Sequence, residues 1–401
     1  MKKLSLLFHL LLAGVSSQAQ QKYFEKVFGT TGTEAGRSVK QLASGSIYVL
    51  GYSSPGAYGG NDICLTKLDR LGNVIWTNYY GDALNNYGLC LNKCLDGNLI
   101  LSGETETFSN GSDAFALKVD TNGNSIWYYT YGNFANQSFR YIEATRDGGY
   151  IACGFATDLS NSNDFYVMKL TSTGQQVWVG NYGGSFNDDA YAIKQIPDGG
   201  FLVTGDTNSD GAGSYDVEVI RLDSLGSILW DGLYGDSLTN GSQGIILLKD
   251  GNYAIYGETE ISPNSAFDFF IQKIDASGTS LWRHTFGGSI SDALFSLVEN
   301  EDKSFVFTGY SNSYAPGPLN LVVGKTDSLA NLQWLHIYGD SGIDMGYQII
   351  ASADSGYLVI GNTFQNGSDD FYLLHVNDSG QVVGMKDVHH NLSSIGIHPN
   401  P

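Results

Sequence analysis

The chain is 401 residues long, 42% hydrophobic and 15% charged, and it contains 51 Gly, 25 Tyr and 20 Phe. This apolar content is sufficient for a large core and excludes an intrinsically disordered chain. The formal net charge of −20, from 41 acidic and 21 basic residues, has the wrong sign for binding a nucleic acid backbone or an anionic bilayer, so we expect no nucleic acid partner.

Residues 1–19 are predicted to be a secretory signal peptide. Two lysines precede an apolar run over residues 4–15, and Ser17 and Ala19 supply the small residues expected before a cleavage site. No Cys follows the run before Cys64, so we expect no lipid anchor. No later apolar run reaches the roughly 20 residues that span a bilayer. We therefore expect a soluble, exported protein without a membrane span.

Residues 23–29 are predicted to form a strand that belongs to the end of the chain. They match the last strand of the repeat described next, with Phe24 at the position that Trp occupies elsewhere. Because the last repeat lacks its own Trp, we expect this strand to pair with the segment 370–376 and to close a ring. Residues 382–388 would then leave the domain as a linker.

The remaining chain is dominated by a repeat of about 52 residues. All six Trp lie in one register, separated by 51, 51, 52, 52 and 52 residues. Around each of them the phrase Asp-x4-Lys-x-Asp-x2-Gly-Asn-x2-Trp-x3-Tyr-Gly recurs with small changes. A seventh copy keeps Asp370 and Gly380 but has Gly384 in place of Trp. The Trp residues of the first six copies are Trp76, Trp127, Trp178, Trp230, Trp282 and Trp334.

Each repeat contains four strand signals, which in the fourth copy cover residues 190–196, 200–205, 216–222 and 227–234. Glycines in the first and third connections favour tight hairpins, because Gly accepts the positive φ that such turns require. Seven repeats of four antiparallel strands each are typical of a β-propeller. The predicted fold is all-β, a seven-bladed β-propeller of four-stranded antiparallel blades over residues 20–388.

The repeat phrase and its Asp-Gly-Gly-Tyr turn resemble the SBBP-like β-propeller repeats of secreted bacterial proteins that use type IX secretion. The tail from Ile395 to Pro401 resembles the opening of the type A C-terminal sorting domain, with His398 where an aromatic residue usually stands. The resemblance implies a secreted or outer-surface protein, in which residues 389–401 are a linker and the truncated start of that sorting domain.

The Trp phrase also loosely resembles the docking motif of quinoprotein dehydrogenase propellers, which makes an oxidoreductase one alternative. Seven repeats rather than eight, and the lack of an adjacent Cys pair, argue against it. Cys90 and Cys94 lie in one predicted strand and would be about 13 Å apart, too far to pair. We interpret all four Cys, including Cys64 and Cys153, as small buried hydrophobic residues.

The repeated residues have both structural and functional interpretations. Trp76 and Tyr80 share one face of a strand, which favours packing between blades, with stacking on sugars as the alternative. The repeated Asp, exemplified by Asp62, is expected to accept hydrogen bonds from local backbone N–H groups, with a repeated calcium site as the alternative. Lys67 and its equivalents are expected to form solvated pairs with the acidic residue two positions later, Asp69 in the first repeat.

No catalytic site is predicted. The repeats contain three His, at 284, 336 and 375, each in a different blade, so no Ser/His/Asp group can be assembled. No Cys/His spacing typical of zinc occurs, and no cofactor is predicted, with Ca²⁺ left open. A glycosidase needs two carboxylates that face one cleft. The sequence does not reveal such a pair.

One face of the propeller is the predicted binding surface. The connections between second and third strands and between blades emerge on this face, here named the loop face, whereas the tight hairpins emerge on the opposite, hairpin face. The loops vary in length and are rich in Ser, Asn, Gly and aromatic residues, as binding loops often are. Acidic residues around this mouth favour a cationic partner or Ca²⁺. Candidate ligand-binding residues are Tyr58, Phe108, Asp113, Asp164, Asp210, Glu258, Tyr314 and Asp370.

These features predict a monomeric, non-catalytic binding or scaffold module that recognises a carbohydrate or a protein through the loop face. A carbohydrate-active enzyme is the main alternative, followed by a quinoprotein-like oxidoreductase.

Overall fold

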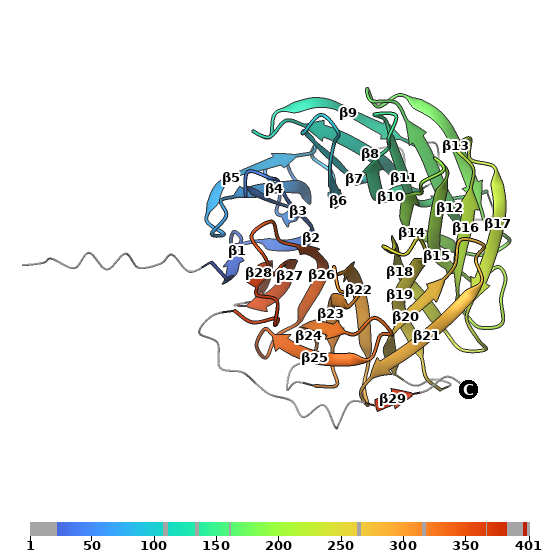
Figure 1. Ribbon diagram of the computed structural model, residues 1–401. Coiled ribbons are helices and arrows are strands. Elements are labelled where there is room, and N and C mark those ends of the chain that lie inside the picture. The colour runs from blue at the N-terminus through green and yellow to red at the C-terminus, as the bar shows by residue number, and fades with distance from the viewer. Residues whose placement is uncertain are drawn as a thin grey trace, which may run out of the picture.

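A computed structural model describes residues 22–106, 111–132, 136–159, 162–262, 266–314, 318–365, 367–382 and 396–398. These residues form seven antiparallel sheets arranged as blades around one axis (Figure 1). The predicted all-β, seven-bladed propeller with four strands per blade is confirmed. The predicted signal peptide, the linker over residues 383–388 and most of the tail lie outside the described residues.

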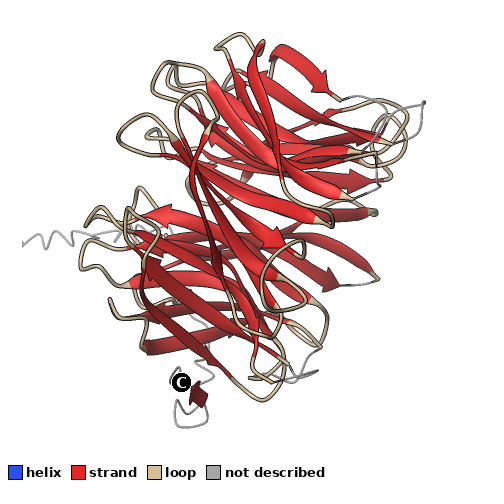
Figure 2. Cartoon of the chain, turned by 90° about the vertical axis from the view of Figure 1, so that its right-hand side faces the viewer, coloured by secondary structure: helices blue, strands red, loops and turns tan. Residues whose placement is uncertain are grey.

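Within a blade the chain runs from the innermost to the outermost strand. Strands follow one another through loops at the two ends of the blades (Figure 2). Across the part of the chain that the structure describes, there is no apolar helix of membrane-spanning length. Blade 1 contains β2 (Thr33–Gln41), β3 (Ile47–Ser54), β4 (Asp62–Leu68) and β5 (Val74–Tyr80); blade 2 contains β6 (Asn86–Lys93), β7 (Leu99–Glu106), β8 (Ser112–Val119) and β9 (Ser125–Tyr131); blade 3 contains β10 (Gln137–Ala144), β11 (Tyr150–Thr157), β12 (Asn163–Leu170) and β13 (Gln176–Tyr182); blade 4 contains β14 (Asp188–Gln195), β15 (Phe201–Thr207), β16 (Asp216–Leu222) and β17 (Ile228–Tyr234); blade 5 contains β18 (Asn240–Leu247), β19 (Tyr253–Glu260), β20 (Phe267–Ile274) and β21 (Ser280–Gly287); blade 6 contains β22 (Asp292–Glu299), β23 (Phe305–Ser311), β24 (Asn320–Thr326) and β25 (Leu332–Tyr338); blade 7 contains β26 (Asp344–Ala351), β27 (Tyr357–Gln365), β28 (Ser368–Val376) and β1 (Phe24–Phe28).

The N-terminal strand closes the ring as predicted. Strand β1 is the outermost strand of blade 7 and pairs antiparallel with β28, with Phe24 opposite His375. The same register places Trp76 opposite Lys67 in blade 1, so Phe24 occupies the Trp position. The first and last segments of the propeller are thus held together by a backbone ladder. In addition, the short strand β29 (Gly396–His398) pairs with the outer edge of β21 in blade 5.

The repeated Trp and Tyr residues pack between blades, as the sequence predicts. A methyl group built on Gly123, in the third hairpin of blade 2, would lie 2.9 Å from the ring of Trp76 in blade 1. Tyr80 donates a hydrogen bond of 2.6 Å to the Gly123 carbonyl. The Trp residues are only partly buried, however, because they lie on the outermost strands of their blades. Removing one should therefore cost less than removing a fully buried ring.

The repeated Lys residues differ from the expectation of solvated pairs with Asp69-type residues. Lys118 is 7% exposed, and its Nζ lies 2.7 Å from a carboxylate oxygen of Asp96 in the first hairpin of its blade. Lys169 forms the equivalent pair with Asp147 at 2.9 Å. The Asp69-type residues instead accept backbone N–H groups of their own turns. The Lys is buried because its aliphatic chain crosses the blade to reach the first hairpin.

The four Cys are buried and unpaired, as the sequence predicts. Cys64, Cys90, Cys94 and Cys153 are each between 0% and 3% exposed. They therefore serve as small core residues, and the fold is held by packing and backbone pairing.

Candidate functional site: a cavity on the propeller axis

Each innermost strand carries a β-bulge at the same place, where one extra residue interrupts the pairing with the second strand. A bulge re-aims its extra residue out of the regular alternation of the sheet. In all seven blades the extra residue lines one cavity of about 630 Å³ on the axis. That volume suits a small ligand. From blade 1 to blade 7 the bulged residues are Arg37, Leu89, Arg140, Tyr191, Gln243, Phe295 and Tyr347.

A glycine on each second strand makes room for the bulge. A methyl group built on Gly51 would lie 1.8 Å from the carbonyl oxygen of Ala35, and one built on Gly103 would lie 1.8 Å from that of Tyr87. A side chain at either position would collide with backbone atoms, so only Gly is accommodated. The same close approach occurs at Gly154, Gly205, Gly257, Gly309 and Gly361.

The residue after this Gly forms a second ring, displaced toward the loop face. Because each second strand runs from the hairpin face to the loop face, a residue one step beyond the Gly lies nearer the loop face than the bulge. Members of this ring contact the bulged residues: Glu258 accepts a hydrogen bond of 3.2 Å from Gln243, and the rings of Tyr310 and Phe295 lie 5.6 Å apart. The ring consists of Tyr52, Glu104, Phe155, Asp206, Glu258, Tyr310 and Asn362.

One side of the cavity, formed by blades 6, 7 and 1, is aromatic and basic. The rings of Phe295 and Tyr347 stack with centroids 5.5 Å apart and planes inclined by 1°. The guanidinium carbon of Arg37 lies 4.1 Å from the Tyr347 centroid and 5.6 Å from that of Tyr52. The phenols raise the pKa of Arg37 against the effect of desolvation, so the side chain stays charged.

Glu104 is the carboxylate that lines the cavity, and two further acidic residues of the second ring, Asp206 and Glu258, lie beside the bulged residues in blades 4 and 5. Asp206 accepts a hydrogen bond of 2.6 Å from the backbone N–H of Ser242, and desolvation together with repulsion from Glu258 holds its pKa well above the usual range. Desolvation also raises the pKa of Glu258 to about 7. Two neighbouring carboxyl groups with raised pKa can act as hydrogen-bond donors as well as acceptors near neutral pH.

Arg140, in blade 3, lies beside the acidic residues of blade 4. Its guanidinium carbon lies 4.4 Å from the ring centroid of Tyr191 and 5.3 Å from that of Phe155. A carboxylate oxygen of Asp189 lies 3.7 Å from its Nη2. Its charge is thus balanced inside the protein, which distinguishes it from Arg37.

The predicted site residues on the loop face are spread around the rim, and only Glu258 contributes to the rings just described. Asp210 is exposed in the loop before β16. Phe108 lies outside the described residues. Tyr314 differs from an exposed binding residue: it is 7% exposed, because its ring folds back to within 3.2 Å of the Cβ position of Gly288. Binding by these residues stays a prediction.

The three remaining acidic candidates are half-buried in the junctions between blades. Asp164 and Asp188, from neighbouring blades, both approach the Cβ position of Gly183, at 2.6 and 2.5 Å. Asp370 and Asp113 lie in the same way beside the glycines that follow their fourth strands. Desolvation raises the pKa of Asp113, Asp164 and Asp370. Their carboxyl groups therefore fill the junctions, whereas the prediction placed them around an open mouth.

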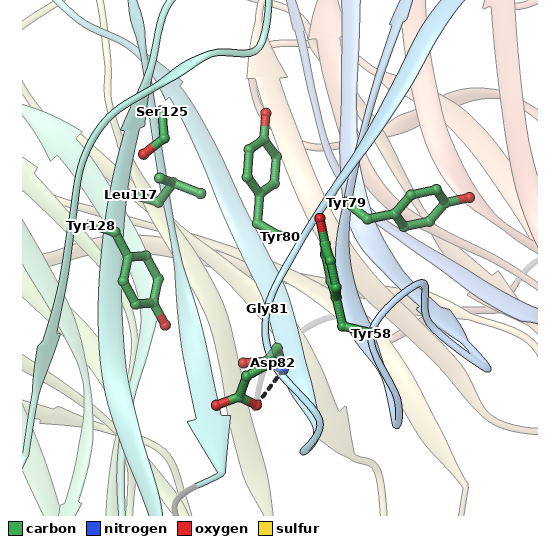
Figure 3. A pocket seen from close by; sticks show the side chains of 9 residues that line it. Tyr58, Tyr79, Tyr80, Gly81, Asp82, Leu117, Ser125 and Tyr128 are labelled. Atoms are coloured by element: carbon green, nitrogen blue, oxygen red, sulfur yellow. Dashed lines mark hydrogen bonds between the residues drawn. The ribbon is translucent and has the colours of Figure 1, made fainter.

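Tyr58 is 58% exposed and borders a separate hollow of about 310 Å³ between blades 1 and 2. Figure 3 shows Tyr58 and Tyr128 on opposite sides of this hollow, with Asp82 between them. The backbone N–H of Tyr58 donates to Asp62, as expected for the repeated Asp. Tyr58 is thus positioned at the rim, away from the axial cavity.

Metal binding has no preformed geometry in the ranges that the structure describes, since no group of three or more His, Cys, Asp or Glu is placed to hold an ion. The axial cavity offers carboxyl, guanidinium, amide and aromatic groups instead. Sequence reasoning missed this cavity. The available signal was the Gly inside every second strand, because Gly in a strand interior often marks a bulge.

Comparisons with known proteins describe the fold. No protein-family model matches the sequence, and no curated protein matches it. Among solved structures, the WD40 domain of Neurospora crassa Pan2 is similar with a TM-score of 0.51 and 10% identity, over 86% of this chain and 90% of that chain. A protein of unknown function from Dyadobacter fermentans has a TM-score of 0.50 and 12% identity, over 88% and 98%. These similarities show that the chain shares the propeller fold.

Proposed function

We propose that the chain is a secreted, non-catalytic binding module that holds a carbohydrate in the axial cavity, entered from the loop face. The observation that carries the proposal is the ring of bulged residues, which brings stacked aromatic rings and planar polar groups into one cavity of about 630 Å³. Sugars bind to such walls because their C–H faces pack on aromatic rings while their hydroxyls pair with amide, guanidinium and carboxyl groups.

The test is a glycan array followed by calorimetric titration of the best ligand. Phe295→Ala removes part of the aromatic wall and should weaken binding by about 3- to 10-fold. Phe186→Ala is the matched control, because this ring is 60% exposed on the loop face and does not line the cavity. Equal effects of the two substitutions, or an array without any bound glycan, would contradict the proposal. Binding of a protein ligand in the absence of any bound glycan would favour protein recognition.

A glycosidase is the second candidate, and the pair Asp206 and Glu258 is the observation that favours it. Both have raised pKa, as a general acid requires, and they belong to neighbouring blades. Release of reducing sugar by the wild-type chain, lost in Asp206→Asn and Glu258→Gln, would establish hydrolysis. Binding without release would favour the binding module.

A further inference from the structure

Arg37 is a cation in the cavity that lacks a carboxylate partner. It forms none of the ion pairs among the described residues, although Glu104 lines the same cavity. The chain has 41 acidic and 21 basic residues, so composition does not explain this lack. Arg140, in the same ring, is matched by Asp189. An unpaired charge in a partly desolvated site is unfavourable for folding, which points to a role toward a ligand.

The Arg37 side chain is held in place with donors left unused. Its Nη2 donates a hydrogen bond of 3.3 Å to the hydroxyl of Tyr52, and the ring of Tyr347 supports the guanidinium plane at 4.1 Å. Its Nε is buried and has no hydrogen-bond partner within the described part of the chain. A guanidinium with its orientation set by two aromatic rings is suited to bind a carboxylate through two parallel hydrogen bonds.

We infer that the cavity selects an acidic sugar, with Arg37 binding the carboxylate of a uronic acid unit whose ring packs against the wall of Phe295 and Tyr347. This inference rests on the proposed carbohydrate-binding function and adds the charge of the ligand to it. Glu104 also lines the cavity, and Asp206 and Glu258 lie across the axis from Arg37 with raised pKa, so these groups favour ligand hydroxyls over a second carboxylate. The preferred unit carries one carboxylate, with hydroxyls toward these acidic groups.

The experiment compares methyl galacturonoside, which carries one carboxylate, with its methyl ester, which has the same sugar ring without the charge. Calorimetric titration of the full chain at low ionic strength would measure both affinities. The variants are Arg37→Gln, which removes the charge, and Arg37→Lys, which keeps the charge but lacks the fork. Arg146→Gln is the matched control on the hairpin face, where Arg146 donates to the Pro197 carbonyl. Thermal unfolding of each variant confirms that the fold is retained.

We expect the acid to bind about 10- to 100-fold more tightly than its ester, as for a hydrogen-bonded charge pair. Arg37→Gln should remove this preference while leaving the ester affinity within about 3-fold, Arg37→Lys should restore part of it, and Arg146→Gln should retain it. Equal affinities for acid and ester, or an equal loss for both in Arg37→Gln, would overturn the inference.

Two further arms separate the inference from the proposed function. A methyl galactoside sulfate tests whether any anion suffices; binding of the sulfate as tightly as the uronate, or more tightly, would overturn the carboxylate assignment. If neutral glycans bind in a manner sensitive to Phe295→Ala but acid confers no advantage, the acidic-sugar inference fails and the binding function stands. If no sugar binds, both fail.

Discussion

The blade junctions and the axial ring are built by opposite rules. At the junctions nearly the same residues recur around the propeller, such as the Trp ring against the next blade's hairpin Gly and the Tyr hydroxyl on that Gly's carbonyl. At the bulge position the backbone is the same in all seven blades, yet the side chains include Arg, Leu, Tyr, Gln and Phe. The repeat therefore encodes a scaffold, and it leaves its residue nearest the axis free to vary.

This contrast explains why the predicted rim residues and the axial ring differ in character. The Asp residues at the junctions are repeated because their carboxyl groups fill a space beside a Gly in six of the seven blades. The bulged residues are not repeated because they contact a cavity that all seven blades share. A bulged residue does not have to fit against the same residue of the next blade. Each blade can therefore contribute a different group to one asymmetric ligand.

The largest effect should follow from blocking a bulge. Gly103→Ala places a methyl group 1.8 Å from the Tyr87 carbonyl oxygen, which is backbone and cannot move without breaking the inner strand pair. We expect a loss of about 3–5 kcal/mol in the free energy of unfolding, measured by denaturant titration. Gly97→Ala in the same blade meets no atom within 4 Å and should cost about 1 kcal/mol through its positive φ alone. Equal losses would contradict the steric role of Gly103.

The next effect concerns a junction aromatic. Trp127→Ala should destabilise by about 2–3 kcal/mol, below the range for fully buried large aromatic residues, because the side chain is only partly buried. Ile126→Ala, 50% exposed on the same strand, should change stability by less than about 0.5 kcal/mol. A Trp127→Ala variant that kept its melting temperature but lost ligand affinity would show that the ring serves binding instead.

A smaller effect should appear as a pH dependence at the junction of blades 5 and 6. Desolvation and the neighbouring Asp292 raise the pKa of Asp268 to about 7. Between about pH 4 and pH 7 the folded state therefore keeps a proton on Asp268 that the unfolded state has released. The stability that this proton contributes is complete below about pH 4 and is lost as the pH rises to about 7.

Asp268→Asn is neutral at every pH, so it should flatten this slope. We expect its free energy of unfolding at pH 8 to exceed that of the wild type by about 1–2 kcal/mol. Parallel profiles for wild type and Asp268→Asn between pH 4 and 8 would refute the raised pKa.

The smallest effect should come from the axial ring itself. Leu89→Gln replaces a half-buried side chain that faces the cavity and should change the free energy of unfolding by less than about 0.5 kcal/mol. The measurement is thermal unfolding of the Leu89→Gln and Trp127→Ala variants under the same conditions. A loss as large as that of the Trp variant would show that the ring is part of the core and would remove the distinction between the two regions.

Much of the fold was predictable because it depends on local patterns repeated seven times. The Trp register set the number of blades, and the match of Phe24 to that register predicted closure through β1, which the pairing with β28 confirms. Pairings that cross a blade were harder: Lys118 reaches Asp96, 22 positions earlier, and nothing in its immediate sequence shows which acidic residue it meets.

The candidate site was predicted less well. Tyr314 and Asp113 lie in or beside loops of suitable composition, yet both are drawn toward blade junctions, because a polar or aromatic side chain beside a Gly can fill the space that the missing Cβ leaves. The composition of a loop indicates solubility and turn formation. It does not indicate which side chains come together in one site.

The amino-acid sequence alone determined the strand order, the number of blades and the residues that pack between them, since each of these follows from periodicity within about 52 residues. Only the tertiary structure decided which side chains meet on the axis. Arg37 and Tyr347 are separated by nearly the whole domain in the chain. The guanidinium carbon of Arg37 nevertheless lies 4.1 Å from the ring centroid of Tyr347, because the propeller closes on itself. Ring closure is a non-local event, and no pattern inside one repeat contains it.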